Sequence, residues 1–268
     1  MKSYLTYFKI RLITEFQYRA SAIAGIFTQF FFGIVFIMVY FAFYQSNGTI
    51  VPPMKWQELI NYLWLQQAFF AIIYPFLKDN ELLDMIKNGN VAYEIIRPQN
   101  FYLKWYIKLL SKKVSAVILR FSPIIIISLI LPSPYNLSAP ISIINFILFI
   151  IALIISSLLS TSLILIIHIL TMFTMDSKGL TSIYSAIAEI FSGSTIPIPF
   201  FPLWLQKIAY LLPFKYIGDL PFRLYSGSIN YLNGIQLILL SLIWLLILIF
   251  IGFIISKKAL NKAVIQGG

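Results

Sequence analysis

The sequence predicts an all-α integral membrane protein with six transmembrane helices, and three observations lead to that prediction. Apolar residues make up 60% of the 268 positions and charged residues only 11%, whereas a soluble domain carries about 25% charged residues. Six stretches approach or exceed the roughly 20 mostly apolar residues that a helix needs to cross a bilayer. Lys and Arg gather in alternate connections between these stretches, which is how membrane proteins mark their cytoplasmic side.

The positions of the six spans follow from the apolar runs and from the Pro and Gly residues between them. The spans are expected at about residues 20–44, 56–77, 114–131, 141–170, 179–196 and 235–255. The fifth is the least regular, because Gly193, Pro197 and Pro199 interrupt it. The first run is longer than the apolar region of a signal peptide and lacks a small-residue cleavage site, so we expect it to be retained. No repeat or linker divides the chain, and residues 1–268 are expected to form a single domain.

The distribution of Lys and Arg predicts the orientation. Fifteen of these residues fall in the N-terminal segment, in the 78–113 connection, at Lys178 and in the C-terminal tail, and four fall on the opposite side. Since the basic side faces the cytoplasm, we expect both termini and the 78–113 loop to be cytoplasmic. The same placement explains the net charge of +11 without a nucleic-acid partner.

Missing residue types exclude several kinds of site. The chain has no Cys and a single His, His168, which excludes a disulfide framework, a thiolate site and a site of two imidazoles. We expect no catalytic residue and no metal site. His168 is interpreted as an interfacial, satisfied imidazole near the cytoplasmic end of the fourth span.

The N-terminal segment 1–19 is predicted to be an amphipathic helix in the cytoplasmic interface. Arg11, Glu15 and Arg19 are spaced four apart, which places them in one charged stripe on a helix. Aromatic residues surround the stripe, as expected at a membrane surface. The alternative is that this segment simply extends the first span.

The 78–113 loop is predicted to begin with a short helix over residues 80–88. Asp79 or Asn80 can cap its start, and Gly89 is a natural terminator at its end. Its charges suit the helix dipole, with Glu81 and Asp84 early and Lys87 late. The stretch that follows is predicted to be extended, because the residue before Pro98 is biased away from helix.

This short helix also has an apolar side, formed by Leu82, Leu83, Met85 and Ile86. We interpret that side as a docking surface for another molecule. The alternative is an ordinary loop helix tucked under the bundle.

The segment 196–234 is predicted to form a re-entrant or interfacial cap on the outer side. It is apolar and aromatic but is broken by Pro197, Pro199, Pro202, Pro213 and Pro221. Residues 203–212 are expected to form a short helix. Irregular backbone at membrane depth is tolerated only where protein or a water-filled cavity surrounds it.

Polar side chains inside the predicted spans are candidates for a translocation path. Arg120 and Glu189 are expected to pair or to line the path, with snorkelling to the interface as the alternative for Arg120. For the glutamines among these side chains, the alternative to a place in the path is ordinary interhelical hydrogen bonding. The full set is Gln29, Gln66, Gln67, Arg120 and Glu189.

The stretches IKNGNVAYEIIRP and IPIPFFPLWLQKIAYLLPFKYIGDLPFRLYSG resemble the permease subunits of type-2 ATP-binding-cassette (ABC) exporters, in the bacterial six-span branch. The resemblance extends over nearly the whole chain. It implies a location in the bacterial inner membrane and a coupling helix at residues 80–88 that sits on an ATPase subunit. It assigns that contact to Asn80, Glu81, Leu82, Asp84, Met85, Lys87, Gly89, Glu94, Arg97 and Asp176.

The resemblance also implies the partners. The sequence contains no GxxxxGK[ST] phosphate loop, so the chain is not expected to be an enzyme and ATP with Mg²⁺ would bind a separate ATPase subunit. A second permease, identical or homologous, would complete the transporter, and the cargo is expected to be hydrophobic or amphipathic. A stand-alone secondary transporter or channel is the alternative, disfavoured by the missing repeat. An intramembrane enzyme is disfavoured by the missing catalytic residues.

Overall fold

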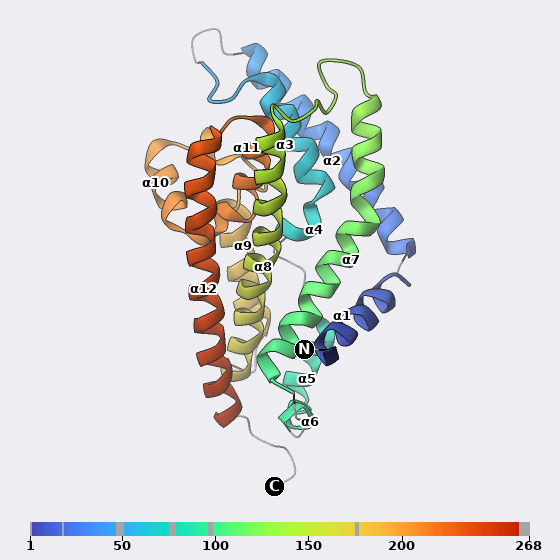
Figure 1. The fold of residues 1–268 in the computed structure, drawn as a ribbon, viewed down its shortest axis with the longest axis vertical. Helices are drawn as coiled ribbons and strands as arrows, with labels where there is room; N and C mark the ends of the chain where they lie inside the picture. Colours follow the sequence, from blue (N-terminus) through green and yellow to red (C-terminus); the bar gives the residue numbers. More distant parts are fainter. Residues whose placement is uncertain are drawn as a thin grey trace.

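The computed structural model describes residues 2–17, 19–46, 51–74, 79–95, 99–174 and 177–262. Over these residues the chain is helical and contains no strand, and its long helices form an elongated bundle (Figure 1). In chain order the elements are α1 (Lys2–Glu15), α2 (Arg19–Ser46), α3 (Trp56–Ala68), α4 (Phe70–Ile73), α5 (Asn80–Lys87), α6 (Ala92–Ile95), α7 (Phe101–Ile130), α8 (Ile143–Thr174), α9 (Ser177–Phe191), η1 (Ile198–Phe200), α10 (Leu203–Leu211), η2 (Pro213–Tyr216), α11 (Asp219–Ser226) and α12 (Tyr231–Lys262).

Four of the described helices are long and apolar enough to cross a membrane: α2, α7, α8 and α12. They correspond to the first, third, fourth and sixth predicted spans. α12 is longer than the predicted stretch 235–255, and α8 extends four residues past the predicted end at residue 170.

The second predicted span is a broken helix. α3 ends at Ala68, and α4 adds one further turn after Phe69, whose backbone angles leave the helical range. α4 stops at Ile73 because Tyr74 precedes Pro75, and the residue before a proline is disfavoured in the helical region. Ten residues of α3 are buried, so this broken helix forms the centre of the bundle rather than a lipid-facing span.

The fifth predicted span is short. α9 has 15 residues and ends at Phe191, and Gly193 follows in a left-handed conformation with φ 76°. The left-handed glycine turns the chain out of the helix.

The third predicted span begins much earlier than expected. α7 starts at Phe101, capped by Asn100, whose Oδ1 accepts a hydrogen bond from the Leu103 N–H at 3.0 Å. Lys104, Lys108 and Lys113 lie inside this helix and are buried, although the sequence pattern placed them in the loop. Lys104 and Lys108 lie one turn apart on one face, where the carboxylates of Glu94 and Asp79 pair with them. Lys113 lies on another face, where its Nζ donates to Ser160 Oγ. Pro123 lies inside α7 as well.

The N-terminal helix is separate from the first span. α1 ends at Glu15, a turn follows, and α2 begins at Arg19, so the predicted single stripe of Arg11, Glu15 and Arg19 does not form. The alternative of one continuous helix is wrong as well. α1 crosses the bundle at an angle and packs against α7 (Figure 1).

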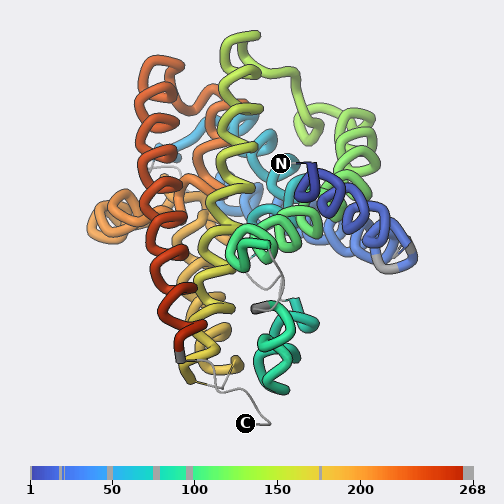
Figure 2. Tube along the Cα trace, turned by 60° about the horizontal axis from the view of Figure 1, so that its bottom comes forward, coloured from blue at the N-terminus to red at the C-terminus, as the bar shows by residue number. Residues whose placement is uncertain are grey.

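Contacts between distant segments show which elements share an end of the molecule. At one end Tyr44 Oη donates to the Met54 carbonyl at 2.6 Å and Trp56 Nε1 donates to the Pro134 carbonyl at 3.2 Å. At the opposite end Arg11 of α1 pairs with Glu81 of α5 at 3.1 Å, and the α5–α6 segment lies at the same end of the bundle as the end of α12 (Figures 1 and 2). The chain therefore passes from one end to the other between residues 54 and 79.

The segment after α9 is irregular, as predicted, and prolines begin its elements. Pro202 caps α10 and Pro213 opens η2, because a proline suits the start of a helix, where its missing N–H is not needed. α10 confirms the short helix predicted at residues 203–212. α11 packs against α3 and α8 and is almost entirely buried.

Candidate functional site

The loop helix α5 is built by local caps, as the sequence indicates. Asp79 caps it, with its Oδ1 accepting a hydrogen bond from the Leu82 N–H at 3.0 Å. Gly89 follows the helix with φ 71°, a conformation that glycine adopts readily.

The stretch after α5 is a second short helix, which corrects the prediction of an extended segment. The Ala92 and Glu94 N–H groups donate to the carbonyls of Gly89 and Val91 at 3.3 and 2.9 Å. The restriction imposed by Pro98 acts on the residue directly before it, and these turns lie farther upstream. Arg97 lies outside the described residues.

α5 has a buried side and an exposed side. Leu82 is fully buried and Ile86 is 5% exposed, while Leu83 and Met85 are half-buried. This apolar side is packed under the bundle of the same chain, as the alternative interpretation held. The polar residues Asp84, Lys87 and Asn88 are exposed, and Tyr93 of α6 is 67% exposed.

A chain of ion pairs joins α5 to α1 and α7. The Arg11 guanidinium donates to both carboxylate oxygens of Glu81, at 3.1 and 3.2 Å. Lys108 Nζ lies 2.8 Å from Glu81 Oε2 and 3.2 Å from Asp79 Oδ1. Burial by itself raises the pKa of Asp79, but Lys108, Lys112 and the Leu82 N–H outweigh it and lower the pKa below the ordinary value. The pKa of Glu81 is lowered in the same way by Lys108 and Arg11 against the effect of burial.

His168 joins the same helix to α8. The Asp79 N–H donates to His168 Nε2 at 3.2 Å, so the ring proton is on Nδ1, which donates to the Ile164 carbonyl at 2.8 Å. The imidazole is buried with both nitrogens engaged. His168 is therefore satisfied, as interpreted, but at 2% exposure it is buried in the bundle rather than interfacial.

α6 is held by another ion pair, between the Glu94 carboxylate and Lys104 Nζ of α7, and both side chains are buried. The loop is thus fixed at both of its ends to α7. Of the other residues assigned to the ATPase contact, Asp176 lies outside the described residues, and neighbouring Lys178 lies in the exposed first turn of α9.

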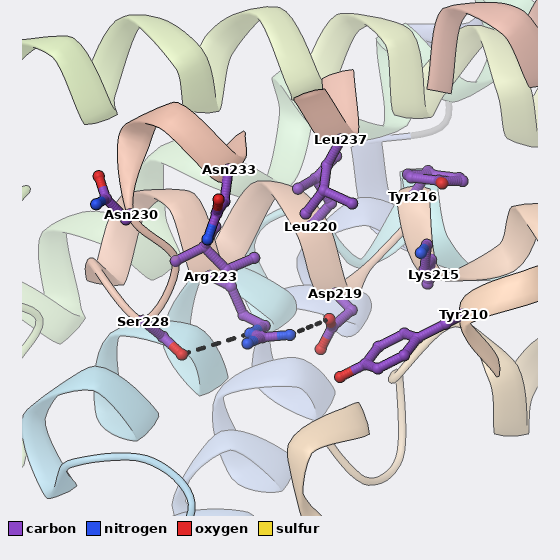
Figure 3. Close-up of a pocket in the computed structure, with 11 residues that line it drawn as sticks. Tyr210, Lys215, Tyr216, Asp219, Leu220, Arg223, Ser228, Asn230, Asn233 and Leu237 are labelled. Atoms are coloured by element: carbon purple, nitrogen blue, oxygen red, sulfur yellow. Dashed lines mark hydrogen bonds and ion pairs between the residues drawn. The ribbon is translucent and has the colours of Figure 1, made fainter. Parts of the chain in front are cut away.

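A second polar site lies among the irregular elements at the opposite end. A cavity of about 350 Å³ opens between η2, α11 and the start of α12 (Figure 3). Arg223 donates from Nη1 to Asp219 Oδ2 at 3.1 Å and from Nε to Ser228 Oγ at 3.4 Å. Lys215 Nζ lies 4.9 Å from the ring centre of Tyr210 and 4.8 Å from that of Tyr216, distances at which an ammonium is attracted to an aromatic face.

None of the sequence-predicted site residues lines this cavity, which lies on the outer side if the predicted orientation holds. The signal that could have found it is the pair Asp219 and Arg223 at i,i+4 spacing in an apolar stretch, since opposite charges at that spacing pair on a helix.

The predicted path residues do not form one cluster. Gln66 Nε2 donates to the carbonyls of Gly193 and Ser194, fixing the turn after α9. Gln29 and Gln67 are buried against neighbouring helices. The amides of these spans therefore fit interhelical packing.

Arg120 and Glu189 do not pair, which corrects that part of the prediction. Glu189 is exposed on α9, where Thr195 Oγ1 donates to its carboxylate at 3.3 Å. The Arg120 guanidinium lies against α2, and no hydrogen bond or ion pair joins it to a residue that the structure describes.

Comparison with known protein families places this chain in one of them. The family model described as ABC-2 family transporter protein matches residues 30–267. No curated protein matches the chain.

Proposed function

Because this chain belongs to the ABC-2 family of transporter proteins, and is thereby a membrane permease component of an ABC transporter, we propose that it exports its cargo with ATP hydrolysed on a separate ATPase subunit. The observation that carries the proposal is the two-sided α5 helix. Its inner side is tied to α1, α7 and α8, and its polar side is exposed beside Tyr93. An element fixed to three helices and exposed on one face can transmit the movement of a docked partner to the bundle.

The test of this proposal uses the exposed side alone. Asp84→Arg combined with Tyr93→Ala changes the proposed contact without touching the ion pairs of Asp79, Glu81 or Glu94. The variant is expected to insert into the membrane normally and to lose the ATPase activity that co-purifies with the wild-type permease. Lys207→Glu, an exposed charge reversal on α10, is the matched control. Equal ATPase activity in the double variant and the control would show that α5 is not the contact.

We also propose that α3–α4 and α9 complete six crossings, with both termini in the cytoplasm of a bacterial cell. The support is geometric. At one end Met54 accepts from Tyr44 and Trp56 donates to Pro134, whereas at the other end Asp79 contacts Lys108 and His168. The α3–α4 segment therefore carries the chain back from the first end to the second. α9 carries it in the opposite direction after α8, because Asn145 at the start of α8 bonds the Leu224 carbonyl at 2.8 Å.

A second permease is proposed to cover the exposed face of α9. This face carries Ile183, Ile187 and Ile190, which are 63, 41 and 49% exposed, and among them the carboxylate of Glu189. A carboxylate facing lipid is costly, so we place Glu189 toward a path between two permeases rather than toward the bilayer.

The cargo is proposed to be amphipathic. The outer cavity sets Lys215 and Arg223 beside the apolar side chains Leu220 and Leu237, which suits a molecule with a charged and an apolar part. Mass spectrometry of small molecules extracted from the purified transporter tests this. A cargo without an apolar portion would contradict it.

A further inference from the structure

A second cavity, of about 430 Å³, lies where α1, α2, α5 and α7 meet, next to the ion pairs that hold α5. Its walls carry Glu15 from the end of α1, Ala22 from α2, Asp79, Asn80 and Glu81 from the start of α5, and Lys112 and Arg120 from α7. The carboxylates of Asp79 and Glu81 are already paired with Lys108. In the orientation proposed above, on which this inference rests, the cavity lies at the cytoplasmic end of two membrane-spanning helices. The proposed function uses none of its open charges.

Arg120 is the unsatisfied group of this cavity. Its Nε is buried without a hydrogen-bond partner, and no carboxylate among the described residues pairs with it. By contrast, Arg11 and Lys108 nearby are both paired with carboxylates. An uncompensated guanidinium inside a membrane span is expensive, so a bound anionic group is expected there.

The position of this guanidinium is fixed by Gly25 of α2. A Cβ atom on Gly25 would stand 2.9 Å from Arg120 Cζ and 3.0 Å from its Nε. Gly25 thus lets the guanidinium lie against the α2 backbone. This contact lies six residues into α2, or about 9 Å from its start by the helical rise.

The carboxylate of Glu15 lies nearer the cytoplasm, at the junction of α1 and α2. It is half-exposed, and no ion pair joins it to a described residue. The cavity thus has an open positive charge at depth and an open negative charge at its rim. Apolar residues flank its deep part: Ala116 and Leu119 line the wall, and Ile23 and Phe27 of α2 are exposed beside it.

We propose that this cavity holds the headgroup of one inner-leaflet phospholipid, with its phosphate on Arg120 and a headgroup amine facing Glu15. In a phospholipid the phosphate lies on the hydrocarbon side of the amine, which is the order of the two open charges. A guanidinium binds phosphate through two parallel hydrogen bonds. The acyl chains would run along the exposed apolar side of α2. An aminophospholipid fits this arrangement better than phosphatidylglycerol, which has no amine for Glu15.

Native mass spectrometry of the purified permease, delipidated in detergent and titrated with phosphatidylethanolamine or phosphatidylglycerol, tests the proposal. The wild-type chain is expected to bind one phosphatidylethanolamine more tightly than phosphatidylglycerol. Arg120→Gln is expected to weaken that first binding event about 10-fold or more, since hydrogen bonds between charged groups are among the strongest. Glu15→Gln is expected to keep binding but to lose the preference for the amine.

Two further variants keep the test independent of folding. Gly25→Ala keeps every charge, suits a helix and displaces the guanidinium, so it is expected to weaken lipid binding as well. Lys9→Gln removes an exposed charge from α1 on the same side and is expected to bind as the wild type does. If Arg120→Gln and Gly25→Ala bind the lipid like Lys9→Gln, the proposal is wrong.

A soluble anion is the other possible source of phosphate. Inorganic phosphate is therefore added to delipidated wild-type protein and Arg120→Gln in a thermal-shift measurement. The proposal expects phosphatidylethanolamine, and not phosphate alone, to stabilise the wild type over the variant. Stabilisation by phosphate without specific lipid binding would overturn it.

Discussion

Lys113 is fully buried in α7, and no carboxylate of a described residue pairs with it. Its Nζ donates to Ser160 Oγ of α8 and to the Ile72 carbonyl at 3.4 Å. Ile72 lies in the last turn of α4, where carbonyls have no partner within the helix and a cation is favoured by the dipole. Lys113 thus caps the end of the broken α3–α4 helix.

Lys113→Ala is expected to destabilise the fold by about 2–4 kcal/mol, because it leaves a cavity and unsatisfied polar groups. The apparent Tm of the purified protein in detergent checks this, with the exposed Lys9→Ala as control. Lys113→Met keeps most of the volume and removes the cap. If Lys113→Met is as stable as the wild type, the capping role is wrong.

Asp79 predicts how stability depends on pH. Its pKa in the folded chain lies below the ordinary value of 3.8, so its ion pairs stabilise the fold above the unfolded pKa and are lost as the pH falls through the folded pKa. The apparent Tm is therefore expected to drop below about pH 4. In Asp79→Asn this part of the drop should be missing, whereas the exposed Asp84→Asn should behave as the wild type does.

At the scale of elements, a helix could be predicted from the sequence where the residues that fix its ends lie within the helix or directly beside it. α5 and α10 were predictable because Asp79, Gly89 and Pro202 act on their own helices. The start of α7 was not, because Lys104 and Lys108 are buried through Glu94 and Asp79, which belong to other elements. Lysines that the sequence pattern places in a loop are buried in a helix here, because carboxylates from other elements pair with them.

Two of the left-handed glycines that follow helices, Gly89 and Gly193, predict different costs for the same substitution. Gly193 has φ 76°, and a Cβ there would stand 2.7 Å from Tyr62 Oη, which donates to the Gly193 carbonyl at 2.9 Å. Gly89 has φ 71° in a half-exposed turn. Gly89→Ala is expected to cost about 1–2 kcal/mol of conformational strain.

Gly193→Ala should add about 1–3 kcal/mol of overpacking to the same strain. Thermal unfolding in detergent shows which variant is less stable, and Gly193→Ala is expected to have the lower Tm. Equal Tm values would mean that the Tyr62 contact relaxes freely.

At the scale of the whole molecule, the proposed crossing by α3–α4 makes a prediction about sidedness. Val51 is 90% exposed before α3, and Tyr93 is 67% exposed after α5. Because the chain has no Cys, Val51→Cys and Tyr93→Cys each create a unique thiol. A membrane-impermeant maleimide is expected to label Val51→Cys in intact cells and Tyr93→Cys only in inverted vesicles. Labelling of both from one side would contradict the crossing.

The proposed permease partner is tested with the same background. Ile190→Cys on the exposed face of α9 is expected to form a disulfide with a second copy in the membrane. Ile151→Cys on the exposed face of α8, which is 40% exposed, is the control and should stay monomeric. If neither position forms a cross-linked dimer, α9 does not face an identical subunit.

The length of α7 has a mechanical consequence. Pro123 has no N–H to donate to the carbonyl four residues earlier, so the helix is weakest there. Before it, the segment from Phe101 carries Lys104 and Lys108, which pair with the carboxylates of Glu94 and Asp79. After it, the Leu137 N–H bonds the Ser128 carbonyl at 2.9 Å and anchors the opposite end of the helix. We expect α7 to bend at Pro123, where a tilt of about 5° over the roughly 33 Å back to Phe101 would displace the Phe101 end by about 3 Å.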